Sequence, residues 1–239
     1  MTSLGKGAAN TPCRSVPEGR LVNAGNGVTI HVRTVGHGHP VLLIPSLGRG
    51  VDDFNTIARL LAAQGYMSIL PEPRGIGGSS GPAPADLFDL AQDCVAVLSS
   101  LCRGPVDVVG HAFGNRVARA LASLDPGRVR ALALLAGGGR TSLNPAIRAA
   151  LMGSLAQGLK ADAERLEDLR TAFFYPGNDP RVWLEGWHPC GRRGAAGGNR
   201  ANLDRAMVDC GEGTGALGPG RRRSHRAHRQ CPCPQCRYR

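Results

Sequence analysis

The sequence predicts an α/β fold with a mostly parallel sheet, helices on both faces of the sheet and a helical insertion. Short apolar runs such as Pro40–Pro45 and Val106–Val109 are typical of strands buried on both faces. These runs alternate with amphipathic helical segments. Alternation of strand and helix is the pattern of a parallel sheet whose crossover connections are helices.

The first half of the chain continues this pattern from a half-buried strand. Val28–Val35 alternates apolar and polar residues, and the turn dipeptide Asn26-Gly27 precedes it. After the run at Pro40 a helix is expected at about 53–64, ended by Gly65. The next strand is expected at Tyr66–Leu70.

The second half predicts two more helices, two more strands and a change of pattern. Helical spacing marks Leu87–Leu101 and Gly114–Leu124, and a strand at Val129–Leu135 follows the buried strand at Val106. Pro145–Leu169 is helix-prone with no strand inside it. We therefore expect a helical insertion, at about 140–175, over the carboxyl ends of the strands, where open α/β sheets bind ligands.

Charge divides the chain into two regions. The length of 239 residues suits one α/β domain, and the net charge is +11. Residues 190–239 hold 11 of the 29 Lys and Arg but only 3 of the 18 Asp and Glu. Because residues 1–189 are close to neutral, a nucleic-acid partner is not expected. We predict one α/β domain over 1–189 and a disordered or out-of-frame tail over 190–239.

No segment indicates a membrane or an export route. There is no apolar run of 18 residues, and residues 1–10 lack the apolar core of a secretory signal. Cys13, Cys94 and Cys102 are the cysteines of the main domain, and free thiols there fit a reducing compartment. We expect a cytoplasmic protein without a membrane partner.

The most informative motif is Gly110-His111-Ala112-Phe113-Gly114, which joins a buried strand to a helix. In a strand–turn–helix of this kind the middle residue sits on a strained turn at the top of the sheet. Small residues two positions before and after it let the turn close, and Gly110 and Gly114 take those places.

Three motifs together resemble the α/β-hydrolase family. The first is the strand–turn–helix at Ala112. Pro45–Gly48 follows the first buried strand, where the family has its oxyanion loop, and Pro73–Ser79 is similar to the family's Arg-Gly-x-Gly-x-Ser turn. The resemblance covers about 28–189. It implies a truncated α/β-hydrolase fold and activity on small esters or related acyl compounds.

The chain departs from this family at the catalytic residues. Ala112 stands where the family has its nucleophilic serine, and loss of a triad nucleophile costs roughly 10⁶-fold in turnover. The family order is nucleophile, acid, histidine. No acid after Ala112 follows a strand in the expected way, and the later histidines are His188, His225 and His228. The resemblance therefore implies a catalytically impaired hydrolase, a pseudoenzyme. The alternative is a non-catalytic module that binds small molecules.

By resemblance, the ligand pocket lies between the elbow, the oxyanion loop and the helical insertion. The pocket residues are Ser46, Leu47, His111, Ala112 and Phe113, and the backbone N–H groups of Leu47 and Phe113 are the expected oxyanion donors. The partner is a small-molecule ligand or substrate. No cofactor and no metal are expected.

Five polar residues receive structural interpretations. His111 is expected to pack and hydrogen-bond at the elbow, and Ser46 to cap a helix or line the pocket. Asp52-Asp53 is interpreted as a helix N-cap and not as a metal site. Arg74 is expected to hold the turn in which it lies.

The tail has the composition of GC-rich DNA read in a wrong frame. Gly220–Ala227, with permitted codons read one base later, gives Gly-Val-Glu-Asp-Arg-Ile-Ala-Pro. This resembles the family's Gly-x-x-Asp-x-x-x-Pro turn, which carries the triad acid. The same shift from Met207 gives two tryptophans and then a possible buried strand, Pro-Leu-Val-Gln-Gly. We therefore interpret the C-terminal part as frameshifted.

Two other interpretations of the tail remain. Cys231, Cys233 and Cys236, with His225 and His228 nearby, suggest a zinc site, but only Cys233 and Cys236 have the usual Cys-x₂-Cys spacing. The arginines suggest an RNA-binding arm, although no aromatic residues are interleaved with them.

Overall fold

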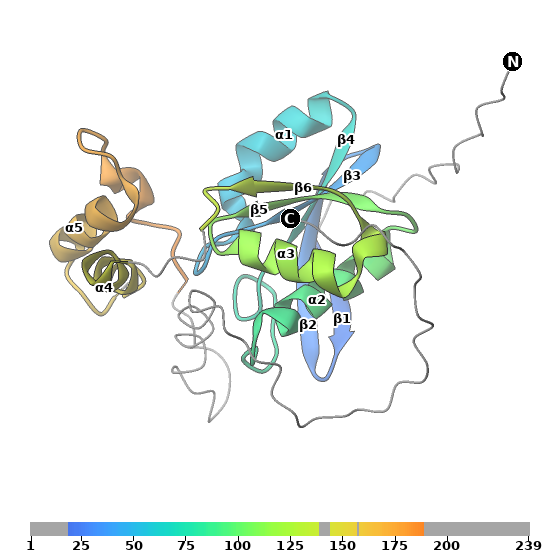
Figure 1. Ribbon diagram of the computed structural model, residues 1–239, viewed down its shortest axis with the longest axis horizontal. Coiled ribbons are helices and arrows are strands. Elements are labelled where there is room, and N and C mark those ends of the chain that lie inside the picture. The colour runs from blue at the N-terminus through green and yellow to red at the C-terminus, as the bar shows by residue number, and fades with distance from the viewer. Residues whose placement is uncertain (1–18, 139–143, 157, 189–239) are drawn as a thin grey trace, which may run out of the picture.

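The computed structural model describes residues 19–138, 144–156 and 158–188. Their strands form one six-stranded sheet in the order β1-β2-β4-β3-β5-β6 (Figure 1). The strands are β1 (Arg20–Gly25), β2 (Val28–Gly36), β3 (His39–Ile44), β4 (Tyr66–Pro71), β5 (Val106–His111) and β6 (Val129–Leu135). β4, β3, β5 and β6 run parallel, whereas β1 and β2 pair antiparallel with each other and β2 with β4. The mostly parallel sheet is confirmed.

Helices cover both faces of this sheet, as the sequence predicts. The α-helices of the described residues are α1 (Asn55–Ala63), α2 (Leu87–Leu101), α3 (Gly114–Leu124), α4 (Pro145–Ser154) and α5 (Asp162–Phe173). Short 3₁₀ turns lie at η1 (Val51–Phe54), η2 (Pro126–Arg128) and η3 (Pro180–Trp183). α1 lies on one face of the sheet, and α2 and α3 lie on the other (Figure 1).

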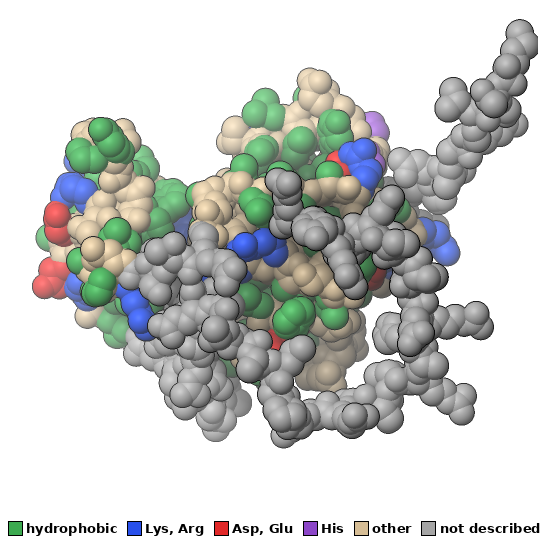
Figure 2. Space-filling model, in the orientation of Figure 1, with side chains coloured by type: hydrophobic (Ala, Val, Ile, Leu, Met, Phe, Trp, Pro, Cys, Tyr) green, Lys and Arg blue, Asp and Glu red, His purple; other side chains and the backbone are tan. Residues whose placement is uncertain are grey.

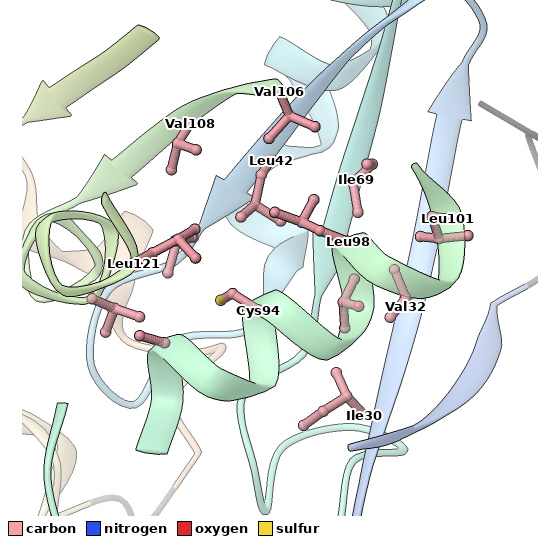
Figure 3. Close-up of a cluster of buried hydrophobic side chains, with 14 of the residues drawn as sticks. Ile30, Val32, Leu42, Ile69, Cys94, Leu98, Leu101, Val106, Val108 and Leu121 are labelled. Carbon is pink, nitrogen blue, oxygen red and sulfur yellow. The ribbon is translucent and has the colours of Figure 1, made fainter. Parts of the chain in front are cut away.

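The larger core lies between the sheet and the α2–α3 layer. Figure 3 shows Leu98 of α2 and Leu121 of α3 directed toward Leu42 and Val108 of the central strands. Cys94 of α2 belongs to the same cluster as a free thiol, and burial raises its pKa to about 12. This layer therefore fixes the central strands whose carboxyl ends carry the candidate site.

The structure differs from the sequence interpretation at four local points. β1 was not predicted, because its six residues alternate only weakly in burial at the edge of the sheet. The helix expected at 53–64 is split into η1 and α1. Likewise, the helix-prone stretch 145–169 forms two helices, α4 and α5. Cys102 is disulfide-bonded, which differs from the free thiol expected there.

β6 ends the sheet and is open to solvent on its outer side. Within the described residues it pairs with β5 alone. Its apolar residues Leu132, Leu134 and Leu135 are 37%, 43% and 41% exposed. An apolar terminal strand of this kind is unusual, since edge strands are normally protected by charge, by proline or by a covering segment.

The helical insertion lies beyond the carboxyl ends of β5 and β6. Figure 1 places α4 and α5 past the arrowheads of these strands, as the sequence predicts. Acidic and basic side chains lie next to each other on this lobe (Figure 2), and ion pairs such as Lys160–Asp168 and Arg170–Glu167 account for several of them. The predictions for the tail, including the Cys231–Cys236 cluster, concern positions outside the described residues.

Candidate functional site

The turn after β5 has the geometry of a nucleophile elbow. β5 ends at His111, α3 begins at Gly114, and Ala112 between them has a φ of +48°. This left-handed conformation is strained for a residue with a Cβ atom. The amide of Ala112 donates to the carbonyl oxygen of Leu135 at 2.9 Å, and its own carbonyl oxygen accepts from the amide of Asn115 at 3.2 Å. Neighbouring backbone thus holds the turn on both sides.

The two glycines of the motif are required by close backbone contacts. A Cβ atom on Gly110 would lie 2.5 Å from the carbonyl oxygen of Gly114. A Cβ atom on Gly114 would lie 2.3 Å from the carbonyl oxygen of Ile44 and 2.6 Å from that of Pro45. The start of α3 therefore packs directly against the end of β3, beside the loop that begins at Ser46.

This loop brings the predicted oxyanion donors to the same edge of the sheet as the elbow. Ile44 pairs with Gly110 in the β3–β5 ladder, so Leu47 and Phe113 both follow the carboxyl ends of adjacent parallel strands. Within the described part of the chain, neither of these two amides donates a hydrogen bond to another group.

His111 lies half-buried against the segment that follows α5. Its ring centroid is 6.3 Å from that of Trp183, in an edge-to-face arrangement. Burial lowers the pKa of His111; the charge of Asp53 opposes this effect, and the charge of Arg49 adds to it. The side chain is therefore a neutral imidazole at pH 7.

Arg49 connects the loop after β3 to the end of the helical insertion. Its side chain is only 6% exposed. Nε and Nη2 donate to the Asp53 carboxylate at 2.9 and 2.6 Å, and Nη1 donates to the Glu185 carbonyl oxygen at 2.7 Å. The guanidinium carbon lies 5.3 Å from the ring centre of Trp183 and 5.0 Å from that of Trp187, within cation–π range.

Phe173, Phe174, Trp183 and Trp187 form an aromatic cluster beside His111. Trp183 contacts the other three rings at centroid distances of 5.2, 5.7 and 6.1 Å, all near edge-to-face. Trp187 is buried, whereas Phe173, Phe174 and Trp183 are half-buried. Edge-to-face contacts of this kind are worth about 0.5–1.5 kcal/mol each beyond the buried area.

The other polar residues singled out in the sequence have structural contacts. Arg74 donates to Asp93 at 2.6 and 2.9 Å and to the carbonyl oxygens of Pro82 and Asp89, so its role in the turn is confirmed. The carbonyl oxygen of Ser46, which is buried, accepts from the Arg49 amide at 3.2 Å.

The N-cap interpretation of Asp52-Asp53 is wrong. Gly50 is the N-cap of η1 and Phe54 is that of α1, and no side chain caps either element. Asp53 pairs with Arg49, and Asp52 lies 3.0 Å from Arg33. Among the described residues, no group of three His, Cys, Asp or Glu side chains has the arrangement of a metal site.

His188 lies beside the loop after β3, next to a buried carboxyl group. Its amide donates to the carbonyl oxygen of Gly48 at 2.8 Å. A Cβ atom placed on Gly50 would be 3.2 Å from His188 Nε2 and 3.3 Å from Glu72 Oε2, so the two side chains flank that glycine. Burial raises the pKa of Glu72.

Most acids that follow Ala112 are engaged in ion pairs on the α3 end or the helical insertion. These pairs are Asp125–Arg128, Asp162–Arg165, Glu167–Arg170, Asp168–Lys160 and Asp179–Arg181.

Two surface hollows also lie away from the elbow. One, of about 400 Å³, is lined by residues of α5 and η3, and one, of about 330 Å³, by residues of α2 and α3. The pocket expected between the elbow and the insertion stays a prediction.

The sequence interpretation missed Glu72, the aromatic cluster and the contacts of Arg49. We call the Arg49 side chain, with its contacts to Asp53, Glu185, Trp183 and Trp187, the Arg49 clamp. One signal for the cluster was present, because five of the chain's ten Phe, Tyr and Trp residues fall within 173–187. The contact of Arg49 with Glu185 spans 136 residues of sequence. No local pattern indicates such a contact.

Comparison with known proteins agrees with this geometry. The family model described as alpha/beta hydrolase fold matches residues 39–177. A 2-hydroxymuconate semialdehyde hydrolase from Pseudomonas sp. (strain CF600) is 34% identical over 134 residues, which cover 54% of this chain and 47% of that protein. An epoxide hydrolase from Caballeronia sordidicola is 31% identical over 112 residues, covering 46% and 34%. The chain thus spans half or less of the length of these relatives.

The fold also agrees with solved structures. A laboratory-evolved variant of a potato epoxide hydrolase superposes with a TM-score of 0.50 at 22% identity, over 61% of this chain and 54% of that one. No helix of the described residues is long and apolar enough to cross a membrane. With the family model matching more than half of its residues, the chain belongs to the α/β-hydrolase fold family.

Proposed function

We propose that this protein binds a small, mostly apolar ester, lactone or acid at the elbow and does not hydrolyse it as a serine hydrolase. The observation that carries the proposal is Ala112 itself. It occupies the strained position at the end of β5, with a φ of +48°, and offers only a methyl group there. A methyl group cannot form the covalent intermediate on which nucleophilic catalysis depends.

The surroundings of the elbow support binding. The backbone N–H groups of Leu47 and Phe113 would donate hydrogen bonds to a ligand carbonyl oxygen, as an oxyanion hole does. His111 and Trp183 supply the apolar and aromatic surface beside them. The matched relatives named as epoxide hydrolases and as 2-hydroxymuconate semialdehyde hydrolases support a small organic ligand.

The proposal also includes the absence of a substitute catalytic pair. His188 lies beside Gly50 and Glu72, and most of the described acids after Ala112 are engaged in ion pairs with neighbouring basic residues. A residual hydrolase is the competing function, because an intact oxyanion hole and binding alone can retain about 10³–10⁴-fold catalysis over water.

Thermal-shift screening of small esters, lactones and acids, run beside turnover assays, tests this function. The expected result is a ligand-dependent rise in Tm without product formation, because a ligand that binds only the folded state stabilises it. Turnover well above background would favour the hydrolase. Turnover that is unchanged in a His111→Ala variant would further show that the reacting site lies elsewhere.

We further propose that the C-terminal part of the chain, from about residue 190, is encoded out of frame. The Arg-rich composition of 190–239 supports this proposal, as does the exposed apolar strand β6, which a following strand would cover. Sequencing of the DNA around the codons for His188–Cys190 should find one base gained or lost. A locus that reads as given, with a tail that folds around stoichiometric zinc, would contradict the frameshift.

A further inference from the structure

The aromatic cluster has more exposed ring surface than a purely structural core requires. Trp183 is its centre, with Phe173, Phe174 and Trp187 around it, yet three of the four residues remain half-buried. In the sheet core, by contrast, residues such as Leu42 are fully buried. Part of the cluster's ring surface is therefore available to a ligand.

The contacts of the Arg49 side chain hold the aromatic cluster next to the elbow. Arg49 packs against Trp183 and Trp187 while its hydrogen bonds join Asp53 to Glu185. As a result, Trp183 lies 6.3 Å from the ring of His111, the residue that precedes Ala112. A ligand with its carbonyl group at the elbow would meet these rings next.

The charges around the cluster favour a neutral ligand. The positive charge of Arg49 is already paired with Asp53 in a two-point hydrogen-bonded contact. Burial lowers the pKa of His111, so its imidazole carries no charge at pH 7. A ligand carboxylate would therefore lose its hydration without gaining a free cation in return.

We propose that the aromatic cluster is the recognition surface of the ligand site, and that the ligand is a small neutral ester or lactone with a planar aromatic or conjugated group. This inference rests on the proposed function and specifies its ligand class. Aromatic rings prefer edge-to-face and offset contacts with one another, and a saturated ring of equal size makes neither. The preference for the planar ligand is about two- to tenfold in affinity.

Intrinsic fluorescence tests the inference directly, because both tryptophans of the whole chain, Trp183 and Trp187, belong to the cluster. Methyl benzoate and methyl cyclohexanecarboxylate are matched probes, one planar and one saturated, and benzoate adds a charge. We expect methyl benzoate to quench the tryptophan fluorescence saturably. In thermal-shift titrations, the concentration of methyl benzoate needed for half-saturation should be two- to tenfold lower than that of methyl cyclohexanecarboxylate. Benzoate at pH 8 should bind more weakly than its methyl ester.

Variants locate the preference. Trp183→Leu and Phe174→Leu should abolish the preference for the planar probe, and Trp183→Phe should retain it, with Trp187 as the remaining reporter. Tyr175→Leu is the matched control, because Tyr175 lies in the same segment, is 80% exposed and belongs to none of the ring contacts of the described residues. Circular dichroism establishes whether each variant is folded. If Trp183→Leu is not folded, Phe174→Leu alone tests the preference for the planar probe.

The possible outcomes distinguish failure of the aromatic recognition surface from failure of the proposed binding function. Equal affinity for the planar and saturated esters, or a preference that survives both leucine variants, would overturn the aromatic recognition surface and leave the binding function standing. Benzoate binding as tightly as its ester would overturn the neutral ligand class. Failure of every probe to bind would overturn the proposed function together with this inference.

Discussion

The amide of Ala112 donates to the carbonyl oxygen of Leu135 at 2.9 Å, so the parallel ladder between β5 and β6 continues one residue beyond His111. This bond holds Ala112 in its left-handed conformation, with a φ of +48°. The strained turn geometry expected for a nucleophile elbow is therefore present at Ala112.

Removing the Cβ atom of Ala112 should relieve this strain. We expect Ala112→Gly to leave the free energy of unfolding unchanged or to raise it by up to about 1 kcal/mol, because glycine adopts a positive φ without steric cost. Ala118→Gly, in the buried interior of α3, is the control and should lower it by about 1 kcal/mol. Urea denaturation measures both. A loss at Ala112 equal to that at Ala118 would contradict the strained turn.

Adding a Cβ atom at Gly114 should have the opposite effect. Because that atom would lie 2.3 Å from the Ile44 carbonyl oxygen, backbone must move, and Gly114→Ala should cost at least about 1–3 kcal/mol. Gly104→Ala is the matched control, since a Cβ atom there meets nothing within 4 Å. If both variants unfold at the same urea concentration, β3 and α3 are not in contact as described.

The Arg49 clamp should contribute strongly to stability. Arg49→Leu leaves Asp53 without its partner and the Glu185 carbonyl oxygen without its donor, so we expect a loss of at least about 2 kcal/mol. Arg181→Leu breaks a solvent-exposed pair with Asp179 and should cost much less than the loss at Arg49. Arg49→Lys should fall between the two, because lysine lacks the planar fork. Equal losses at positions 49 and 181 would refute a buried clamp.

Glu72 should make stability depend on pH. Burial raises the pKa of Glu72, and the charge of Asp52 adds to this rise. The hydrogen bond from the Val51 amide and the charges of Arg33 and His188 lower the pKa and oppose it. A carboxyl group of this kind contributes stability below its unfolded value of 4.5 and loses that contribution as pH rises through the folded pKa. Glu72→Gln should thus have a higher Tm than the wild type at pH 8, and the difference should vanish below pH 4.5. If the Tm difference between Glu72→Gln and the wild type instead grows toward acid pH, the pKa of Glu72 is not raised in the folded state.

Most of the fold could be predicted from the sequence, because its signals are local. The bounds of α2, α3 and β6 agree with those predicted, since helical spacing and short apolar runs define them. β1 was missed because a short, half-exposed edge strand has little apolar pattern. The split of α4 from α5 was also missed, although Gly158, which has a φ of +73°, lies between the two helices.

The site could be predicted only in part. Glycine spacing located the elbow at Ala112, since close backbone contact restricts residue type at Gly110 and Gly114. The Arg49 clamp could not be predicted, because its partners come from a loop and a 3₁₀ turn far apart in the chain. The position of His188 near Glu72 likewise depends on tertiary contacts.

Turnover of small esters by the wild type and by Ala112→Ser, in this same chain, tests the central claim most directly. The wild type has alanine at position 112, and we expect no histidine–acid pair to activate the serine of the variant. We therefore predict that both proteins release product from p-nitrophenyl acetate and methyl benzoate at the rate of the buffer blank. Hydrolysis by the wild type well above that rate, or substantial activity gained by Ala112→Ser alone, would contradict the account.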